Sequence, residues 1–91
     1  MATVYRIFCG IDNKSYVGIT LDFGRRKYDH LNDLRKNKHY NHFLQYAFNM
    51  HGEKNFIFEV LESDIETKSR RLNEKLWMEK IGRYNLYNYI F

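Results

Sequence analysis

A cation and a histidine stand four residues apart, at Arg26 and His30, in a segment with helical periodicity. Residues at this spacing lie on the same face of a helix, so the two side chains are expected to be neighbours. A guanidinium can clamp two phosphate oxygens, and an imidazole can carry a proton near neutral pH. The pair suits phosphate chemistry, although a solvated basic helix face with an incidental histidine explains the same spacing equally well.

Two tyrosines, Tyr5 and Tyr16, lie in segments rich in β-branched and aromatic residues, on either side of a polar stretch at residues 12–14. This pattern predicts a β-hairpin whose tyrosines project from the same face. A two-residue turn at Asp12-Asn13 would pair Tyr16 with Cys9 and leave Tyr5 about 13 Å further along the strand. A bulge or a shifted register would bring the phenols together. Strand periodicity alone favours a half-buried aromatic pair with hydrated hydroxyls.

A carboxylate at Glu74 falls in a long run without helix breakers, which predicts a last helix over residues 66–83. On a helical wheel this carboxylate borders apolar surface. A lone carboxylate there can give one ligand to Mg²⁺ or Mn²⁺, with waters and a substrate phosphate completing the coordination shell. From these residues alone, an ion pair back to Arg70 or Arg71 is the better interpretation.

The histidines and the cysteine raise the question of a zinc site. His39 and His42 are close in sequence, while Cys9, His30 and His51 lie elsewhere in the chain. The paired ligand spacings of structural zinc sites are absent. The sequence therefore argues against structural zinc.

Length and composition limit the class of protein. The 91 residues, with 44% hydrophobic and 18% aromatic content, predict one domain spanning residues 1–91 and exclude a second folded module. A lone Cys9 cannot form an internal disulfide, which favours an intracellular location. No stretch approaches the roughly 18 apolar residues of a membrane span, so no membrane association is expected.

The charge is positive and unevenly distributed. The formal net charge is +4, which points to a polyanionic partner. Residues 25–38 carry six cations against two carboxylates, whereas residues 53–66 carry five carboxylates against one lysine. One side of the protein is therefore expected to be basic.

Local signals place six elements along the chain. Strands over Thr3–Cys9 and Ser15–Thr20 precede a helix capped by Asp22 and a second helix capped by Asn41. A third strand over Asn55–Glu62 precedes the last helix. The order β-β-α-α-β-α predicts an α+β fold in which helices flank a small antiparallel three-stranded sheet. The second helix is expected to bury a face made of Phe43, Leu44, Ala47 and Phe48.

The order and spacing of these signals resemble the GIY-YIG nuclease family over residues 3–88, and particularly the catalytic domains of phage intron-encoded homing endonucleases. The two motifs that name the family match residues 3–5 and 16–18, with threonine in place of the first glycine. Further matches are Arg25-Arg26, His30, Asn41, Gly52, Glu74 and Tyr87-Asn88. Asn88 joins the expected catalytic residues on this basis, although Asn85 also follows a tyrosine and competes for the same role.

The resemblance implies a divalent-metal-dependent endonuclease that hydrolyses DNA phosphodiester bonds with one metal ion, leaving 5′-phosphate and 3′-hydroxyl ends. It implies that Glu74 holds the Mg²⁺ or Mn²⁺ ion and that Arg26 stabilises the pentacovalent phosphorus. Tyr5 would be the general base or relay the proton of the attacking water, with nearby cations or the metal lowering its pKa. Tyr16 would position the water or the phosphate, and His30 would assist proton transfer.

A DNA-contacting surface is expected from the motifs and the basic segment: Gly18, Arg25, Lys27, Arg35, Lys36, Lys38, His39 and Asn41. The implied place of action is the cytoplasm or the nucleoid, and a phage or mobile-element origin fits this interpretation. The sequence favours no oligomeric state. The alternative function is a catalytically inactive nucleic-acid-binding module with the same fold.

Overall fold

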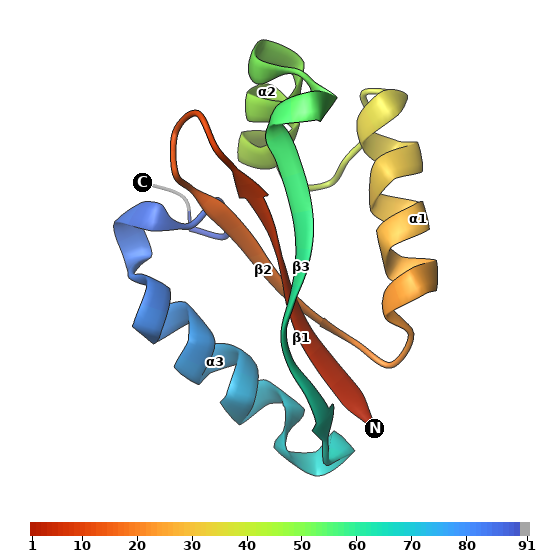
Figure 1. Cartoon of the computed structure of the whole chain (residues 1–91), viewed down its shortest axis with the longest axis vertical. Helices are drawn as coiled ribbons and strands as arrows, with labels where there is room; N and C mark the ends of the chain where they lie inside the picture. Colours follow the sequence, from red (N-terminus) through yellow and green to blue (C-terminus); the bar gives the residue numbers. More distant parts are fainter. Residues whose placement is uncertain (90–91) are drawn as a thin grey trace.

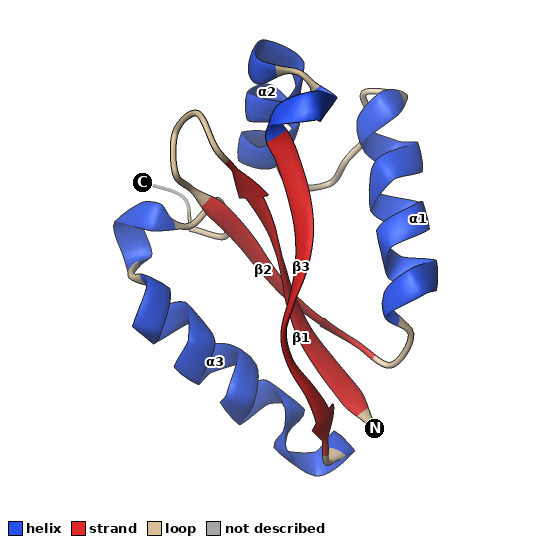
Figure 2. Cartoon of the chain, in the orientation of Figure 1, coloured by secondary structure: helices blue, strands red, loops and turns tan. Residues whose placement is uncertain are grey.

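The central strand of the sheet is the first strand in the sequence. The computed structural model describes residues 1–89. It has an antiparallel three-stranded sheet of order β2-β1-β3, built from β1 (Ala2–Cys9), β2 (Ser15–Thr20) and β3 (Phe56–Ile65). The helices are α1 (Phe23–Arg35), α2 (His42–His51) and α3 (Arg70–Ile81) (Figures 1 and 2). The α+β class and the element order β-β-α-α-β-α are confirmed.

The two faces of the sheet support separate hydrophobic clusters. One face presents Tyr5 and Ile7 to a cluster that includes Leu34 of α1 and Leu44 of α2. The other face presents Val4 and its neighbours to a cluster that includes Trp77, Met78 and Ile81 of α3. Figure 1 accordingly shows α1 and α3 on opposite sides of the sheet. Alternation along β1 decides which side chains meet which helix.

The hairpin register differs from the predicted one. Tyr5 is paired with Gly18 and Tyr16 with Ile7, so the predicted pairing of Tyr16 with Cys9 is wrong. The loop is longer than a two-residue turn, because the Cys9 N–H donates to the Lys14 carbonyl at 3.0 Å. The predicted common face of the two tyrosines is retained. Relative to the predicted pairing, the observed register places Tyr16 two residues closer to Tyr5 along β1, so the two phenols lie nearer each other on that face.

The predicted caps of the first two helices are present. Asp22 Oδ1 accepts from the Arg25 N–H at 3.0 Å, and Asn41 Oδ1 accepts from the Leu44 N–H at 2.9 Å. The predicted buried face of α2 is partly wrong, since Phe43 is 44% exposed and Gln45 is buried. Gln45 lies inside because its side chain accepts from the His39 N–H at 2.9 Å and donates to the Leu34 carbonyl at 3.1 Å.

The last helix is shorter and the third strand longer than predicted. A 3₁₀ turn over Thr67–Ser69 precedes α3, and Gly82, at φ 96°, ends it. The strand extends to Ile65, which pairs with Ala2 beyond a register shift. Among residues 1–89, no helix is both long enough and apolar enough to span a membrane.

Gly18 makes room for the Tyr5 ring. A Cβ placed at Gly18 would lie 2.9 Å from Tyr5 Cε1, and closer still to the end of the ring. Gly18→Ala is therefore expected to lower the free energy of unfolding by about 1–3 kcal/mol, as overpacking does. Urea denaturation measures this change.

The matched control is Gly24→Ala, because a Cβ at Gly24 meets nothing closer than 3.8 Å. That helical substitution is expected to stabilise the protein by up to about 1 kcal/mol. Equal stability of the two variants would contradict the packing role of Gly18.

Candidate active site

A chain of hydrogen bonds runs from Tyr5 into the protein. Tyr5 Oη lies 2.6 Å from His30 Nε2, and His30 Nδ1 lies 2.7 Å from His39 Nε2. The backbone N–H of Asn41 reaches His39 Nδ1 at 3.0 Å. Tyr5, His30 and His39 are 1%, 2% and 4% exposed. We call these three side chains the relay.

The Asn41 N–H fixes the direction of the relay. A backbone N–H can only donate, so His39 Nδ1 is an acceptor, and a neutral His39 carries its proton on Nε2. That N–H donates to His30 Nδ1, which places the His30 proton on Nε2. His30 therefore donates to the oxygen of Tyr5. The Tyr5 proton is left to point away from the histidines.

The relay histidines are held in their neutral forms. Burial, and then the neighbouring His39 and Arg26, lower the pKa of His30 to about 3. Burial also lowers the pKa of His39. A neutral imidazole has one N–H donor and one nitrogen acceptor, which is what the directions of the relay hydrogen bonds require of both histidines.

This arrangement predicts a loss of stability in acid. An unfolded histidine binds a proton below its ordinary pKa of 6.5, whereas folded His30 stays neutral until about pH 3. The unfolded state thus binds more protons in this window, and stability falls as the pH falls. The expected slope is up to about 1.4 kcal/mol per pH unit for each such histidine, measured by urea denaturation between about pH 6.5 and about pH 5.

A His30→Gln variant is expected to flatten the slope. His42→Gln is the matched control, because His42 is an exposed histidine at the start of α2, outside the relay. A slope that is the same in all three proteins would contradict the assignment.

Tyr5 is a protonated phenol at neutral pH. Burial raises its pKa to about 12, although the hydrogen bond and the charge of Arg26 oppose this rise. The lowering of the Tyr5 pKa that the family resemblance implied is therefore outweighed by burial in this structure. The side chain is suited to passing a proton on.

Arg26 and Tyr40 form the outer edge of the site. The Tyr16 and Tyr40 hydroxyls are hydrogen-bonded, and Arg26 Nη2 donates to Tyr40 Oη at 3.3 Å. Burial alone would lower the pKa of Arg26, but its interactions with the Tyr5 and Tyr40 hydroxyls raise it. Burial, and then the bond to Tyr40, raise the pKa of Tyr16 above its usual value. The site thus combines a permanent cation with protonated hydroxyls.

The sequence reasoning missed Tyr40, and it gave Gln45 no role beyond a match to the family pattern. Tyr40 is 57% exposed and lies in the connection between α1 and α2, where no periodicity marks it. Gln45 Oε1 accepts from the His39 N–H at 2.9 Å and fixes the loop that carries the relay. The available signal was a glutamine among the apolar residues of the second helix, since a polar group in such a position needs hydrogen-bond partners.

Glu74 is a carboxylate without a close partner. It is half-buried on α3, and no described residue of the chain gives it a hydrogen bond or an ion pair within 4 Å. The ion pairs considered with Arg70 or Arg71 are not formed. Burial raises the pKa of Glu74, opposed by the charge of Arg71, and the Glu74 charge in turn raises the pKa of Tyr5. A partly desolvated and unpaired oxygen donor fits a hard divalent cation.

Asn88 clamps the edge strand. Its Oδ1 accepts from the Val17 N–H and its Nδ2 donates to the Val17 carbonyl, both at 2.8 Å. Asn85 instead donates to the Ile81 carbonyl at 3.2 Å. The hydrogen bonds of Asn88 hold the backbone beside Gly18, which is a positioning role.

The expected DNA-contacting residues divide into two groups. Lys27, Lys36 and Lys38 lie on α1 and the segment after it, and all three are exposed to solvent. Arg25 joins these lysines, because its side chain stays 75% exposed although it lies 3.6 Å from Asp29. The other four are engaged within the protein: Gly18 is buried against Tyr5, Arg35 pairs with Glu53 at 2.6 Å, His39 is in the relay, and Asn41 caps α2 and donates to the Tyr87 carbonyl. The described contacts of His39 and Asn41 are thus within the protein, and their contact with DNA stays a prediction.

In this chain, two tyrosines of the β-hairpin thus meet an arginine and a histidine carried by α1. The sequence profile of the GIY-YIG catalytic domain matches residues 1–88, and the chain belongs to this family. The resemblance seen in the sequence is thereby confirmed.

Its similarity extends to particular proteins. The chain is 36% identical over 90 residues to Intron-associated endonuclease 1 of Enterobacteria phage T4, covering 91% of this chain and 36% of that relative. The catalytic domain of homing endonuclease I-TevI superposes with a TM-score of 0.86 at 31% identity, covering 96% of each chain. A point mutant of the catalytic domain of intron endonuclease I-TevI superposes with a TM-score of 0.84 at 33% identity, covering 97% of this chain and 93% of the other.

Proposed function

We propose that the chain is the catalytic domain of a DNA endonuclease that hydrolyses phosphodiester bonds with a single divalent ion. Membership of the GIY-YIG family and similarity to an intron-associated endonuclease support this function. The observation that carries it is the meeting of the relay with Arg26 at one site. A binding module has no need of a buried histidine pair that orients a tyrosine hydroxyl.

Arg26 binds the scissile phosphate. Its guanidinium is charged at every relevant pH, and its fork can contact two phosphate oxygens. The Tyr40 hydroxyl accepts one of its N–H groups at 3.3 Å and so limits its orientations. A fixed cation at the point where negative charge builds lowers the barrier to phosphoryl transfer.

Tyr5 relays the proton of the attacking water. Because its pKa is about 12, it enters the reaction as a phenol. Its oxygen accepts a proton from water while its own proton passes to a phosphate oxygen, so no separate tyrosinate is needed. His30 donates to the Tyr5 oxygen and keeps the Tyr5 proton pointing outward, while Tyr16 and Tyr40 offer further hydroxyls to the water or the phosphate.

Glu74 is the residue that would hold the divalent ion, Mg²⁺ or Mn²⁺. Such an ion, when bound, neutralises charge on the phosphate as the bond to the leaving group breaks. The products are a 5′-phosphate and a 3′-hydroxyl. The lysines Lys27, Lys36 and Lys38 contribute salt-sensitive contacts to the DNA backbone. The enzyme would act on DNA in the cytoplasm or the nucleoid, and this location fits an origin in a phage or mobile element.

Conversion of supercoiled plasmid to nicked and linear forms tests the function. Cleavage is expected with Mg²⁺ or Mn²⁺ and not with EDTA. DNA ligase is expected to seal the nicks, because it requires a 5′-phosphate next to a 3′-hydroxyl. A double variant, Arg26→Ala with Glu74→Gln, purified in the same way, controls for contaminating nucleases.

Cleavage in EDTA, or equal cleavage by the double variant, would contradict the proposal. If the protein retards DNA at low salt and cuts none under any of these conditions, the binding-module alternative replaces it. Nicks that ligase cannot seal would reject the proposed end chemistry.

A further inference from the structure

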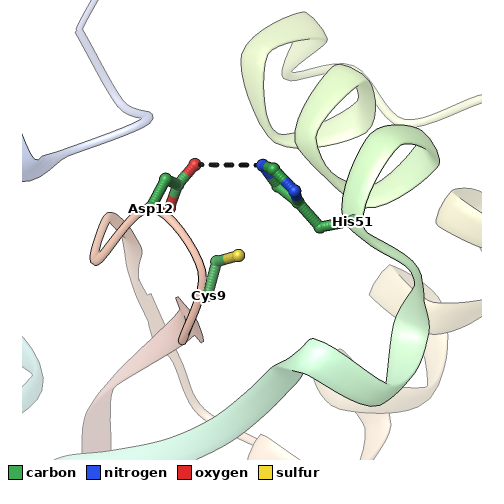
Figure 3. Close-up of side chains that lie close together, drawn as sticks. All are labelled: Cys9, Asp12 and His51. Carbon is green, nitrogen blue, oxygen red and sulfur yellow. Dashed lines mark ion pairs between the residues drawn. The ribbon is translucent and has the colours of Figure 1, made fainter.

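Three metal-ligating side chains meet at the end of the sheet that the hairpin loop closes. Cys9, Asp12 and His51 offer a thiol sulfur, a carboxylate oxygen and an imidazole nitrogen that all lie within 4.8 Å of one another (Figure 3). Asp12 Oδ2 and His51 Nε2 are 3.9 Å apart. Cys9 ends β1, Asp12 lies in the hairpin loop, and His51 is the last residue of α2. The chain folding brings together residues that no sequence spacing connects.

The donor set matches a borderline-soft transition metal. Thiolate, imidazole and carboxylate are the three ligand types of Zn²⁺, at about 2.0–2.3 Å from the ion. At those bond lengths, tetrahedral ligand atoms lie about 3.3–3.8 Å apart. The carboxylate–imidazole pair is close to this spacing, and the sulfur needs only a small side-chain adjustment.

The ligands are held in place by the surrounding fold. The Tyr87 hydroxyl donates to both Asp12 oxygens, at 2.8 and 2.7 Å, and the Lys14 N–H donates to Asp12 Oδ1 at 3.0 Å. The His51 carbonyl accepts from Asn55 Nδ2 at 2.6 Å. Hydrogen bonds that orient a ligating carboxylate are typical of metal sites.

An ion can reach the cluster from solvent. The Cys9 side chain is buried, but the side chains of His51 and Asp12 are 19% and 26% exposed. A fourth position, open to water, completes a tetrahedral shell. This combination of a buried thiol with two partly exposed ligands differs from the oxygen-only site expected at Glu74.

We propose that Cys9, Asp12 and His51 form a Zn²⁺ site that is separate from the catalytic centre. Binding exchanges the Cys9 thiol proton, released to solvent, for a sulfur–zinc bond. The ion would join the end of β1, the hairpin loop and the end of α2, and it would stabilise the fold. Cys9 is four residues along β1 from Tyr5, about 13 Å at the rise of a strand, so the two sites are distinct.

Cobalt(II) serves as the spectroscopic probe. Titration of the metal-free protein with Co²⁺ is expected to saturate at one ion per chain and to give a thiolate-to-cobalt charge-transfer absorption that Zn²⁺ then displaces. Cys9→Ser is expected to abolish this absorption. Tyr87→Phe, which removes the hydrogen bonds to Asp12, is expected to weaken binding by about 10-fold, and His51→Gln by more.

Two controls make the assignment specific. His42→Gln removes an exposed histidine and Glu74→Gln removes the expected catalytic ligand, and both are expected to retain the absorption. Should Cys9→Ser not fold, the thermal shift decides: Zn²⁺ is expected to raise the Tm of the wild-type protein and leave that of His51→Gln unchanged. The proposal would be overturned if wild-type protein gave no thiolate absorption, or if His51→Gln bound Co²⁺ as tightly as wild type. It would also be overturned if Glu74→Gln lost the absorption. These outcomes do not depend on whether the protein cleaves DNA.

Discussion

Replacing Glu74 with glutamine is expected to slow metal-dependent plasmid cleavage by at least about 10³-fold, since charge neutralisation by a metal is worth several kcal/mol and each 1.36 kcal/mol is tenfold. Glutamine preserves the shape of the side chain and removes the charge that would hold the ion. The effect is measured as the nicking rate over a series of Mg²⁺ concentrations. A rate restored by high Mg²⁺ would show weakened ion binding and would still place the ion at Glu74.

The same substitution has a second readout in stability. Burial raises the pKa of Glu74, and no described residue compensates its charge within 4 Å. A group whose pKa is raised by folding destabilises the protein at pH values above its unfolded pKa. Glu74→Gln is therefore expected to match or exceed the stability of the wild-type protein at neutral pH, so that lost cleavage reflects lost chemistry.

The matched control for Glu74→Gln is Glu79→Gln, an exposed carboxylate on the same helix. This variant is expected to cleave at the wild-type rate. Equal rates for the two variants would remove Glu74 from the site.

The elements of the fold could be predicted because local chemistry marks them. Asp22 and Asn41 cap their helices with the side-chain bonds that their residue types predict. The strand register could not be predicted in the same way. It depends on the loop at residues 10–14, closed by backbone hydrogen bonds such as that of Asn13, for which side chains give only a weak signal.

The candidate site was only partly predictable for a related reason. Arg26 and His30 are four apart on one helix, so their proximity follows from spacing. His39 and Tyr40 lie in a loop, where their contacts depend on how α1 and α2 pack. The direction of the relay depends on a single backbone N–H, that of Asn41. Neither the loop contacts of His39 and Tyr40 nor the hydrogen bond of the Asn41 N–H follows a periodic pattern in the sequence.

The group formed by Cys9, Asp12 and His51, the proposed Zn²⁺ site, shows the same limit more sharply. Cys9 and His51 are far apart in sequence and follow no ligand spacing of a known zinc motif. They meet because β1 ends where α2 ends, which only the three-dimensional packing determines. Tertiary contacts of this kind are invisible to arguments from spacing.

Replacing Arg26 with alanine is expected to lower kcat for DNA cleavage by about 10²–10³-fold, the cost of losing one preorganised donor at a developing negative charge. Arg26→Lys is expected to recover only part of this loss, because an ammonium keeps the charge but lacks the planar fork. Loss of the guanidinium also removes the interaction that opposes the raised pKa of Tyr5. The relevant measurement is single-turnover cleavage at saturating protein, which separates chemistry from DNA binding.

Arg25→Ala is the matched control, since Arg25 is the adjacent residue and its side chain is 75% exposed. It is expected to raise KM and reduce the salt dependence of binding while leaving kcat within about 2-fold, as a lost phosphate contact does. The comparison distinguishes a cation that acts in the transition state from one that only holds DNA. If Arg26→Ala changed KM alone, in the manner expected of Arg25→Ala, the guanidinium would have to be reassigned from catalysis to DNA binding, because uniform binding energy does not appear in kcat.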